Sequence, residues 1–311
     1  MAEKEGGLAY VFPGQGSQRV GMGFDLYQGF SSAREVFEEA DDALGFPLSR
    51  LCFEGPEEEL SQTANAQPAI LTVSLACLRA ASQVAGQLIC PAFMAGHSLG
   101  EYTALVAAQV LDFLDAVRLT RERGRLMQEA GERVPGGMVA IIGLDELSVE
   151  QVCQEADAQI ANLNSPGQIV ISGAKETLAR AADLARAMGA RHVMPLKVSG
   201  AFHSPLMQPA ADGMAQAISP LNFRDPNVPI VVNSTAHPVT AADGVKEELL
   251  RQLCHCVQWQ RSVEYMVGAG VSTFIEIGPG QVLSGLIKRI SNEAQILNIG
   301  DAESIGVMRG W

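Results

Sequence analysis

The sequence predicts an α/β fold in which a large domain with a mainly parallel sheet carries a small inserted α+β domain. Short apolar runs without period-2 alternation are typical of strands buried on both faces of a parallel sheet. Here they are residues 8–12, 92–95, 229–232, 273–277 and 296–299. Stretches with helical periodicity alternate with them, as α/β architecture requires, for example 67–84, 101–110, 112–130 and 205–218.

The middle of the chain has a different element order. A strand (138–143), a helix (147–156), a hairpin (159–163 and 168–172), a second helix (175–188) and a last strand (192–198) follow one another. This β-α-β-β-α-β order is that of a ferredoxin-like domain. We therefore expect residues 133–199 to form a small ferredoxin-like domain, inserted in a large α/β-hydrolase-like domain made of residues 1–132 and 200–311. Ligand sites favour clefts between such domains.

Composition limits the classes of function. The 311 residues include 22 Lys and Arg against 35 Asp and Glu, a formal net charge of −13, and 47% are hydrophobic. A sizeable core is expected, and a nucleic-acid partner is not, because phosphate contacts need clustered Lys and Arg. Residues 1–9 do not resemble an export signal, and no window has the uninterrupted apolar length of a membrane span. We expect no membrane partner and a cytoplasmic protein, or one of an organelle matrix if a transit peptide has been removed.

The six cysteines are scattered along the chain. The one cluster, Cys254-His255-Cys256, lacks a second ligand pair at zinc spacing. We interpret these cysteines as reduced structural thiols and expect no metal.

The pentapeptide Gly96-His97-Ser98-Leu99-Gly100 matches the G-x-S-x-G pattern of a nucleophile elbow. It lies between an expected strand and an expected helix, which is the setting that such an elbow needs. Glycines without a Cβ permit the strained turn, and Ser98 would project at the positive end of the helix. The alternative is that Ser98 only caps the helix.

A serine nucleophile needs a base, and His203 is the best candidate among the five histidines. It lies in a loop that enters a helix, where the small domain rejoins the large one. His97 adjoins the serine and should point away from it, and the others read as strand, turn or core residues (His192, His237 and His255). A purely structural role for His203 remains open. No acid presents itself as a third member, which argues against an ordinary hydrolase.

Arg123 occupies a position where an apolar residue is expected. On the helix after Asp112, Ala116, Leu119, Leu126 and Ala130 share one face, and position 123 fills the gap in that stripe. The other arginines of this helix fall on the opposite face (Arg118, Arg121 and Arg125). An inward-facing guanidinium must be paired or face a cavity, and it suits a substrate carboxylate. An internal salt bridge is the alternative.

Two glycine-rich loops follow strands. Gly14-Gln15-Gly16 comes after the first expected strand, and its backbone N–H groups can point into the cleft. An oxyanion hole takes one N–H from the residue after the nucleophile, here Leu99, and Gln15 is a candidate for the second donor. An ordinary tight connection is the alternative, and residues 278–280 read as an ordinary turn at the cleft edge.

With these residues assembled, the sequence resembles the malonyl-CoA:acyl-carrier-protein transacylases of fatty acid synthesis. The resemblance runs from about residue 8 to the end of the chain. Seven motifs in family order carry it: VFPGQGSQ at 11–18, GHSLGEY at 96–102, RG at 123–124, NSPGQIVISG at 164–173, GAFHSPLM at 200–207, CVQWQRSVEYM at 256–266 and IEIGPG at 275–280.

The resemblance implies a role for each matching residue. Ser98 would be the acylated nucleophile, His203 its base, and Arg123 the ligand of the malonyl carboxylate. The backbone N–H groups of Gln15 and Leu99 would bind the oxyanion. The backbone carbonyl of Gln258 would accept a hydrogen bond from the other nitrogen of the histidine, which would account for the missing acid.

The resemblance also implies a substrate preference and a partner. Phe202, beside the histidine, would leave little room for a methyl group on the substrate α-carbon. Arg191, Lys288 and Arg289 would face an acyl carrier protein, although ordinary solvated charges are an equal alternative.

The reaction that we expect is a ping-pong transfer of malonyl from malonyl-CoA to a carrier-bound phosphopantetheine thiol, with no cofactor, in a protein that is a monomer by default. A serine esterase or thioesterase and a non-catalytic binding module are the alternatives. The sequence leaves open which carrier is used and whether the pathway makes fatty acids or polyketides.

Overall fold

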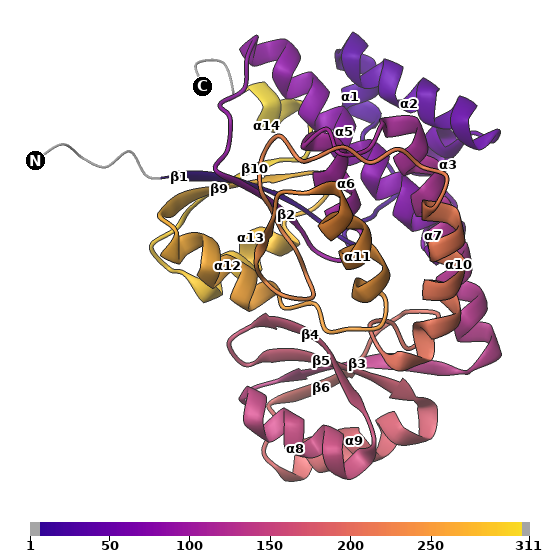
Figure 1. Ribbon diagram of the computed structural model, residues 1–311, viewed down its shortest axis with the longest axis vertical. Coiled ribbons are helices and arrows are strands. Elements are labelled where there is room, and N and C mark those ends of the chain that lie inside the picture. Colours follow the sequence, from indigo (N-terminus) through magenta and orange to yellow (C-terminus); the bar gives the residue numbers. More distant parts are fainter. Residues whose placement is uncertain (1–6, 307–311) are drawn as a thin grey trace, which may run out of the picture.

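A computed structural model describes residues 7–306 of the chain and contains two separate sheets (Figure 1). The six-stranded sheet has the order β10-β9-β1-β2-β7-β8. Its pairings are parallel except for β7 with β8. The strands are β1 (Gly7–Phe12), β2 (Phe93–Gly96), β7 (Ile230–Val231), β8 (Pro238–Val239), β9 (Val271–Ile277) and β10 (Gln295–Ile299). The prediction of a mainly parallel sheet, with strands at all five expected places, is confirmed.

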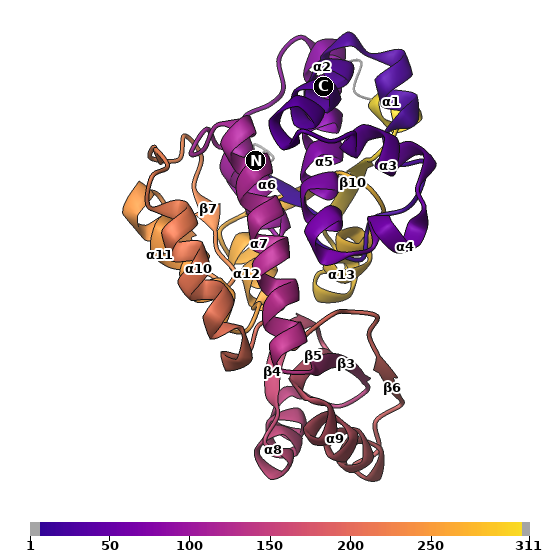
Figure 2. The ribbon, with the colours of Figure 1, turned by 90° about the vertical axis from the view of Figure 1, so that its right-hand side faces the viewer.

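Helices cover both faces of this sheet. Along β1, Tyr10 and Phe12 face one apolar core while Ala9 and Val11 face another, which is why the strand shows no polar alternation. Figure 2 shows α7 (Phe113–Arg133) beside α5 (Thr63–Ala85) and α6 (Gly100–Ala107). Helices α12 (Trp259–Gly268) and α13 (Val282–Ile290) pack on the other face, in the core that contains Ala9 and Val11. The helices that precede the small sheet are α1 (Phe24–Gly29), α2 (Ser31–Leu44), α3 (Leu48–Glu54), α4 (Glu57–Leu60), α5 (Thr63–Ala85), α6 (Gly100–Ala107) and α7 (Phe113–Arg133). Those that follow it are the 3-10 turn η1 (Pro205–Met207), α10 (Gln208–Ile218), α11 (Ala242–Gln252), α12 (Trp259–Gly268), α13 (Val282–Ile290) and α14 (Ala302–Gly306).

Helix α5 is a core helix. It is long and apolar enough to cross a membrane by length and composition, but 67% of its most apolar window is buried inside the protein. Pro68 lies within it and has no N–H to donate, so the carbonyl of Ala64 is free and accepts a hydrogen bond from Arg121 of α7 at 2.9 Å. This bond helps to hold α7 against α5.

The four-stranded sheet has the order β4-β5-β3-β6 with antiparallel pairings. Its elements follow the expected order: β3 (Gly136–Ile142), α8 (Glu146–Ala156), β4 (Gln159–Ser165), β5 (Gln168–Ala174), α9 (Lys175–Ala187) and β6 (His192–Pro195). Helices α8 and α9 cover one face of this sheet, where Val139 and Ile141 are buried. Met138 and Ala140 point the other way, into the core of the larger part.

The two parts are tied together at the edge strand β4. Leu163 donates its backbone N–H to the carbonyl of Val257 at 2.9 Å, and Val257 donates to Ala161 at 2.8 Å. An ion pair between Arg261 and Glu146 at 2.7 Å joins α12 to α8. These bonds fix the small sheet beside the carboxyl ends of the parallel strands.

Candidate active site

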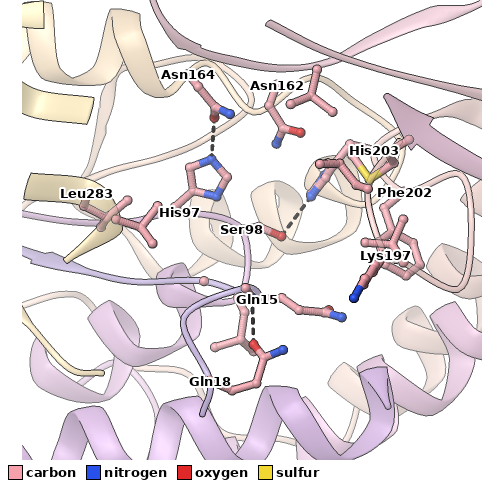
Figure 3. Close-up of a pocket in the computed structure, with 18 of the residues that line it drawn as sticks. Gln15, Gln18, His97, Ser98, Asn162, Asn164, Lys197, Phe202, His203 and Leu283 are labelled. Carbon is pink, nitrogen blue, oxygen red and sulfur yellow. Dashed lines mark hydrogen bonds between the residues drawn. The ribbon is translucent and has the colours of Figure 1, made fainter. Parts of the chain in front are cut away.

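A cavity of about 500 Å³ lies between the two parts (Figure 3). The larger part contributes the loop around Gln15, the elbow at Ser98 and the buried Arg123. The small sheet contributes Asn162 and Asn164 of β4. The sequence predicted a ligand cleft between the two domains, and the cavity lies in that position.

The chain makes a sharp elbow at Ser98, between β2 and α6. Ser98 has a φ of 51°, in the left-handed region that costs a non-glycine residue energy. A Cβ on Gly96 would lie 1.9 Å from the carbonyl carbon of Gly100, and one on Gly100 would lie 2.0 Å from the carbonyl oxygen of Phe12. Only glycine fits at either position. Leu99 is the residue that precedes α6, and within residues 7–306 the Ser98 hydroxyl bonds to His203 and Arg123 rather than to a backbone N–H of the helix, so the capping alternative is wrong.

Asn233, which follows β7, holds this elbow in place with hydrogen bonds. Its side-chain oxygen accepts the backbone N–H of Ser98 at 2.7 Å, and its side-chain nitrogen donates to the carbonyl of Gly96 at 2.6 Å. Its own backbone N–H donates to the buried Glu101 carboxyl at 2.9 Å. Neither Asn233 nor Glu101 was predicted from the sequence to act at this site. The adjacency of Glu101 to the elbow was the one available signal.

His203 meets the serine. Its Nε2 lies 2.8 Å from Ser98 Oγ, and its Nδ1 lies 2.8 Å from the backbone carbonyl oxygen of Gln252. Burial, and then the positive charge of Arg123, lowers the pKa of His203 to about 3. The imidazole is therefore neutral at pH 7. With a proton on Nδ1 for the carbonyl, Nε2 is free to accept the serine proton.

The expectation that Gln258 supports His203 is wrong, because Gln252 supplies that carbonyl. Gln258 is the capping residue before α12, and its carbonyl oxygen accepts the backbone N–H of Ser262 at 2.9 Å. Gln252 is the last residue of α11, where carbonyls have no partner within the helix. The carbonyl of Gln252 is therefore available to accept the imidazole N–H.

The other histidines lie away from the serine hydroxyl. His97 points toward the small sheet, where its Nε2 lies 2.8 Å from Asn164 Oδ1 (Figure 3). His192 and His237 are exposed. His255, which was expected on a core segment, is exposed as well, because its turn after α11 faces solvent.

Arg123 is buried on the inward face of α7, with 1% of its surface exposed. Its Nη2 lies 3.2 Å from Ser98 Oγ. Its other acceptors are amide oxygens, Gln67 Oε1 at 2.7 Å and Gln252 Oε1 at 2.8 Å. Within residues 7–306 no carboxylate lies within 4.0 Å of this guanidinium, so the internal salt bridge does not form.

The remaining helix arginines are placed nearly as expected. Arg118 and Arg125 are exposed and pair with acids of their own helix. Arg121 is half-buried against α5, so it is not on a fully solvated face. Gln67 was not predicted, although the sequence contains a signal for it: like Arg123, it interrupts an apolar helical run. In the structure Gln67 is fully buried.

The residues expected to form an oxyanion hole and a selectivity wall line the cavity. In the part of the chain that the structure describes, the backbone N–H groups of Gln15 and Leu99 have no hydrogen-bond acceptor. Phe202 is 4% exposed and lines the cavity beside His203.

The three expected carrier-facing cations are exposed. Arg191 and Arg289 line a second cavity of about 580 Å³ where the two parts meet. Arg289 also bonds to the side-chain oxygen of Gln168, whereas the Nζ of Lys288 donates to the carbonyl of Asn292 at 2.5 Å.

An elbow serine paired with a neutral histidine, in a cleft with a buried arginine that has no carboxylate partner among the described residues, is an arrangement typical of enzymes that transfer acyl groups. Residues 9–310 match the family model described as the acyl transferase domain, and the chain belongs to this family.

Relatives share nearly the whole chain. A protein of Bacillus subtilis (strain 168) named malonyl CoA-acyl carrier protein transacylase is 45% identical over 303 residues, 96% of this chain and 95% of that protein. Its namesake in Escherichia coli (strain K12) is 49% identical over 287 residues, 91% of this chain and 92% of that protein.

Solved structures agree. An acyl carrier protein S-malonyltransferase from Vibrio cholerae superposes with a TM-score of 0.92 at 43% identity, covering 96% of this chain and 99% of that one. A malonyl-transacylase solved in complex with a holo acyl carrier protein of a type II polyketide synthase gives 0.93 at 44% identity, covering 97% and 98%.

Proposed function

We propose that this protein transfers a malonyl group from malonyl-CoA to the phosphopantetheine thiol of an acyl carrier protein, for fatty acid or polyketide synthesis. The observation that carries the proposal is the position of Arg123. Its guanidinium is buried beside Ser98 Oγ and lacks a carboxylate partner among the described residues. An acyl group that ends in a carboxylate supplies that partner. The names of the relatives agree with it.

The first half-reaction forms malonyl-Ser98. His203 Nε2 takes the serine proton, and Ser98 Oγ attacks the thioester carbonyl of malonyl-CoA. The N–H groups of Gln15 and Leu99 stabilise the oxyanion; their lack of an acceptor in the described residues supports this role. When the tetrahedral adduct collapses, the C–S bond breaks and the CoA thiolate takes the proton from the imidazolium.

The second half-reaction reverses these steps with the carrier thiol as nucleophile. His203 accepts the thiol proton, sulfur attacks the ester carbonyl, and the C–O bond to Ser98 breaks with return of the proton. Ser98 and His203 supply the proton transfers that these steps need, and the two backbone N–H groups stabilise the charge that develops. We therefore propose that the reaction uses no cofactor.

Two further roles extend the proposal. Phe202, buried in the cavity wall beside His203, limits space at the substrate α-carbon and favours malonyl over methylmalonyl. Arg191, Lys288 and Arg289 provide local positive charge for the carrier on a chain whose net charge is −13. The shared cavity of Arg191 and Arg289 supports this role, and increasing salt should weaken carrier binding.

We also propose that residues 1–132 and 200–311 form an α/β-hydrolase-like domain and residues 133–199 an inserted ferredoxin-like domain. The antiparallel order β4-β5-β3-β6 supports the second assignment, and the elbow supports the first. A monomer and a cytoplasmic or organelle-matrix location remain our predictions, as does the absence of a nucleic-acid or membrane partner.

Intact-protein mass spectrometry tests the proposal. Incubation with malonyl-CoA should add one malonyl group to the protein, and addition of holo carrier protein should move that group to the carrier. Ser98→Ala should form no adduct. Rapid release of free malonate without a carrier would favour a thioesterase instead. Failure of the wild-type protein to form any adduct would favour a non-catalytic binding module.

A further inference from the structure

The two glutamines that hold Arg123 offer it only neutral oxygens. Gln67 comes from α5 and Gln252 from the end of α11, and both are fully buried. Their amide orientations are fixed by their other contacts, since Gln252 Nε2 donates to the carbonyl of Ser98 at 3.0 Å and Gln67 Nε2 lies 3.4 Å from Met127 Sδ. A guanidinium only donates, so the oxygens must face it.

The charge of Arg123 is therefore uncompensated by its hydrogen-bond partners. Glu101 is a candidate for compensation, but its carboxyl accepts the backbone N–H of Asn233, and it forms no ion pair with the guanidinium in the part of the chain that the structure describes. Burial, and then the Glu248 carboxyl, raises the pKa of Glu101 well above its usual range, which favours its neutral form. The Nε of Arg123 also lacks a hydrogen-bond partner in the described residues.

We propose that Gln67 and Gln252 contribute to the choice of acyl group through their neutrality, because their amides accept hydrogen bonds from the Arg123 guanidinium without cancelling its charge. A buried unpaired charge is costly, and binding of a carboxylate-bearing acyl group removes that cost. A carboxylate in place of either amide would form an internal ion pair with the guanidinium and neutralise its charge. It would also repel the carboxylate of the acyl group. This inference rests on the proposed function and adds the physical basis of its selectivity for charged acyl groups.

The close packing of α5 and α7 makes the arrangement possible. A Cβ on Gly124, next to Arg123, would lie 2.5 Å from the carbonyl oxygen of Thr63. The helices therefore meet at this glycine, and the approach brings Gln67 within 2.7 Å of Arg123.

The test compares Gln67→Glu with Gln67→Met in the full-length protein. Both replacements are close to glutamine in length, and only one adds charge. The readout is the ratio of acylation rates with malonyl-CoA and acetyl-CoA, measured by intact mass in quench-flow. Gln67→Glu should lower this ratio about tenfold or more, because the new carboxylate neutralises Arg123 and repels the carboxylate of the malonyl group in a buried site. Gln67→Met should keep the ratio within about threefold of wild type, since the charge of Arg123 stays uncompensated.

The second part of the test asks whether the effect of Gln67→Glu depends on Arg123. In an Arg123→Ala background, Gln67→Glu should lower the ratio by a smaller factor than it does in the wild type, because no guanidinium remains to be neutralised and only the repulsion of the acyl carboxylate is left. An unchanged ratio in Gln67→Glu, or an equal fall in Gln67→Met, would overturn the inference. A wild-type protein that forms no malonyl adduct would instead refute the proposed function. If Gln67→Glu does not fold, as judged by circular dichroism, Gln252→Glu with Gln252→Met as its control reports the same ratio.

Discussion

Ser98 and His203 both have left-handed backbone conformations, with φ values of 51° and 57°, and their side chains meet with 2.8 Å between Oγ and Nε2. Each such conformation costs a non-glycine residue roughly 1–3 kcal/mol. The surrounding structure must hold both, and Asn233 does so for Ser98 through two hydrogen bonds. The pair is thus aligned in the absence of substrate.

Removal of the Asn233 side chain should slow acylation of Ser98. Asn233→Ala deletes the bonds to the N–H of Ser98 and the carbonyl of Gly96, so the elbow relaxes and the hydroxyl moves away from His203. We expect the acylation rate to fall about 10- to 100-fold, since small misplacements of reacting groups have effects of this size. Quench-flow with malonyl-CoA measures it. The exposed Asn227 provides the control, and an equal loss in Asn227→Ala would contradict the assignment.

The pH dependence of acylation should reflect the lowered pKa of His203. Because that pKa is about 3, the imidazole stays neutral and basic well below its usual range. The acylation rate should be flat from pH 8 to about pH 5 and should fall only nearer the lowered value. If the acylation rate instead fell tenfold per pH unit below the ordinary histidine pKa of 6.5, the pKa of His203 would not be lowered by burial.

The same shift has a consequence for stability. Between the ordinary pKa of 6.5 and about 3, the unfolded chain binds a proton at this histidine that the folded protein does not. The contribution of His203 to the free energy of unfolding therefore falls as the pH is lowered through this window. Urea titrations of wild type and His203→Gln across this window measure the difference. The variant should lose less stability on acidification, and equal losses would contradict the shift.

Arg123→Ala should change the choice of acyl group. Loss of the guanidinium removes the partner of the malonyl carboxylate, so malonyl transfer should fall about 100-fold or more while acetyl transfer is retained or favoured. Parallel assays with the two CoA thioesters measure this. Arg118→Lys is the control, because Arg118 lies on the same helix and is exposed. Equal losses with both thioesters in Arg123→Ala would contradict a carboxylate-binding role.

Phe202→Ala should admit a branched substrate. The smaller side chain opens space beside the α-carbon, and one methyl group in a pocket is typically worth 10- to 200-fold, so the malonyl preference over methylmalonyl should fall by about tenfold. Competition between the two thioesters for the serine, followed by mass spectrometry, reads the preference directly. A preference that stays as in wild type would show that another residue limits the space.

Gly124→Ala should destabilise the protein because α5 and α7 touch there. The new Cβ would lie 2.5 Å from one backbone oxygen and 2.7 Å from the Cα of Ala64, so the helices must separate. We expect the free energy of unfolding to fall by about 1–3 kcal/mol. Gly285, a helical glycine of α13, has nothing within 4 Å of an added Cβ. Gly285→Ala should therefore raise stability by about 0.5–1 kcal/mol. Equal effects in the two variants, measured by urea denaturation, would contradict this account.

Local pattern was sufficient for much of this protein. The alternation of strands and helices, the elbow at Ser98 and the inward position of Arg123 each depend on residues within about five turns of chain, where periodicity determines which side chains share a face. His203 followed from its loop-to-helix setting, and the structure brings it to the serine. These features were readable because short-range geometry is encoded in short-range sequence.

The sequence alone did not determine the partners that reach the site from distant elements. Gln252 rather than Gln258 supports His203, because the docking of α11 decides which free carbonyl faces the ring. Gln67 and Asn233 likewise reach Arg123 and Ser98 only through the packing of helices and strands separated by 56 and 135 positions. Charge compensation in a buried site depends on these long-range contacts. The sequence therefore determined which groups could react. The tertiary structure decided which groups hold them, and within residues 7–306 it gives the arginine no carboxylate partner.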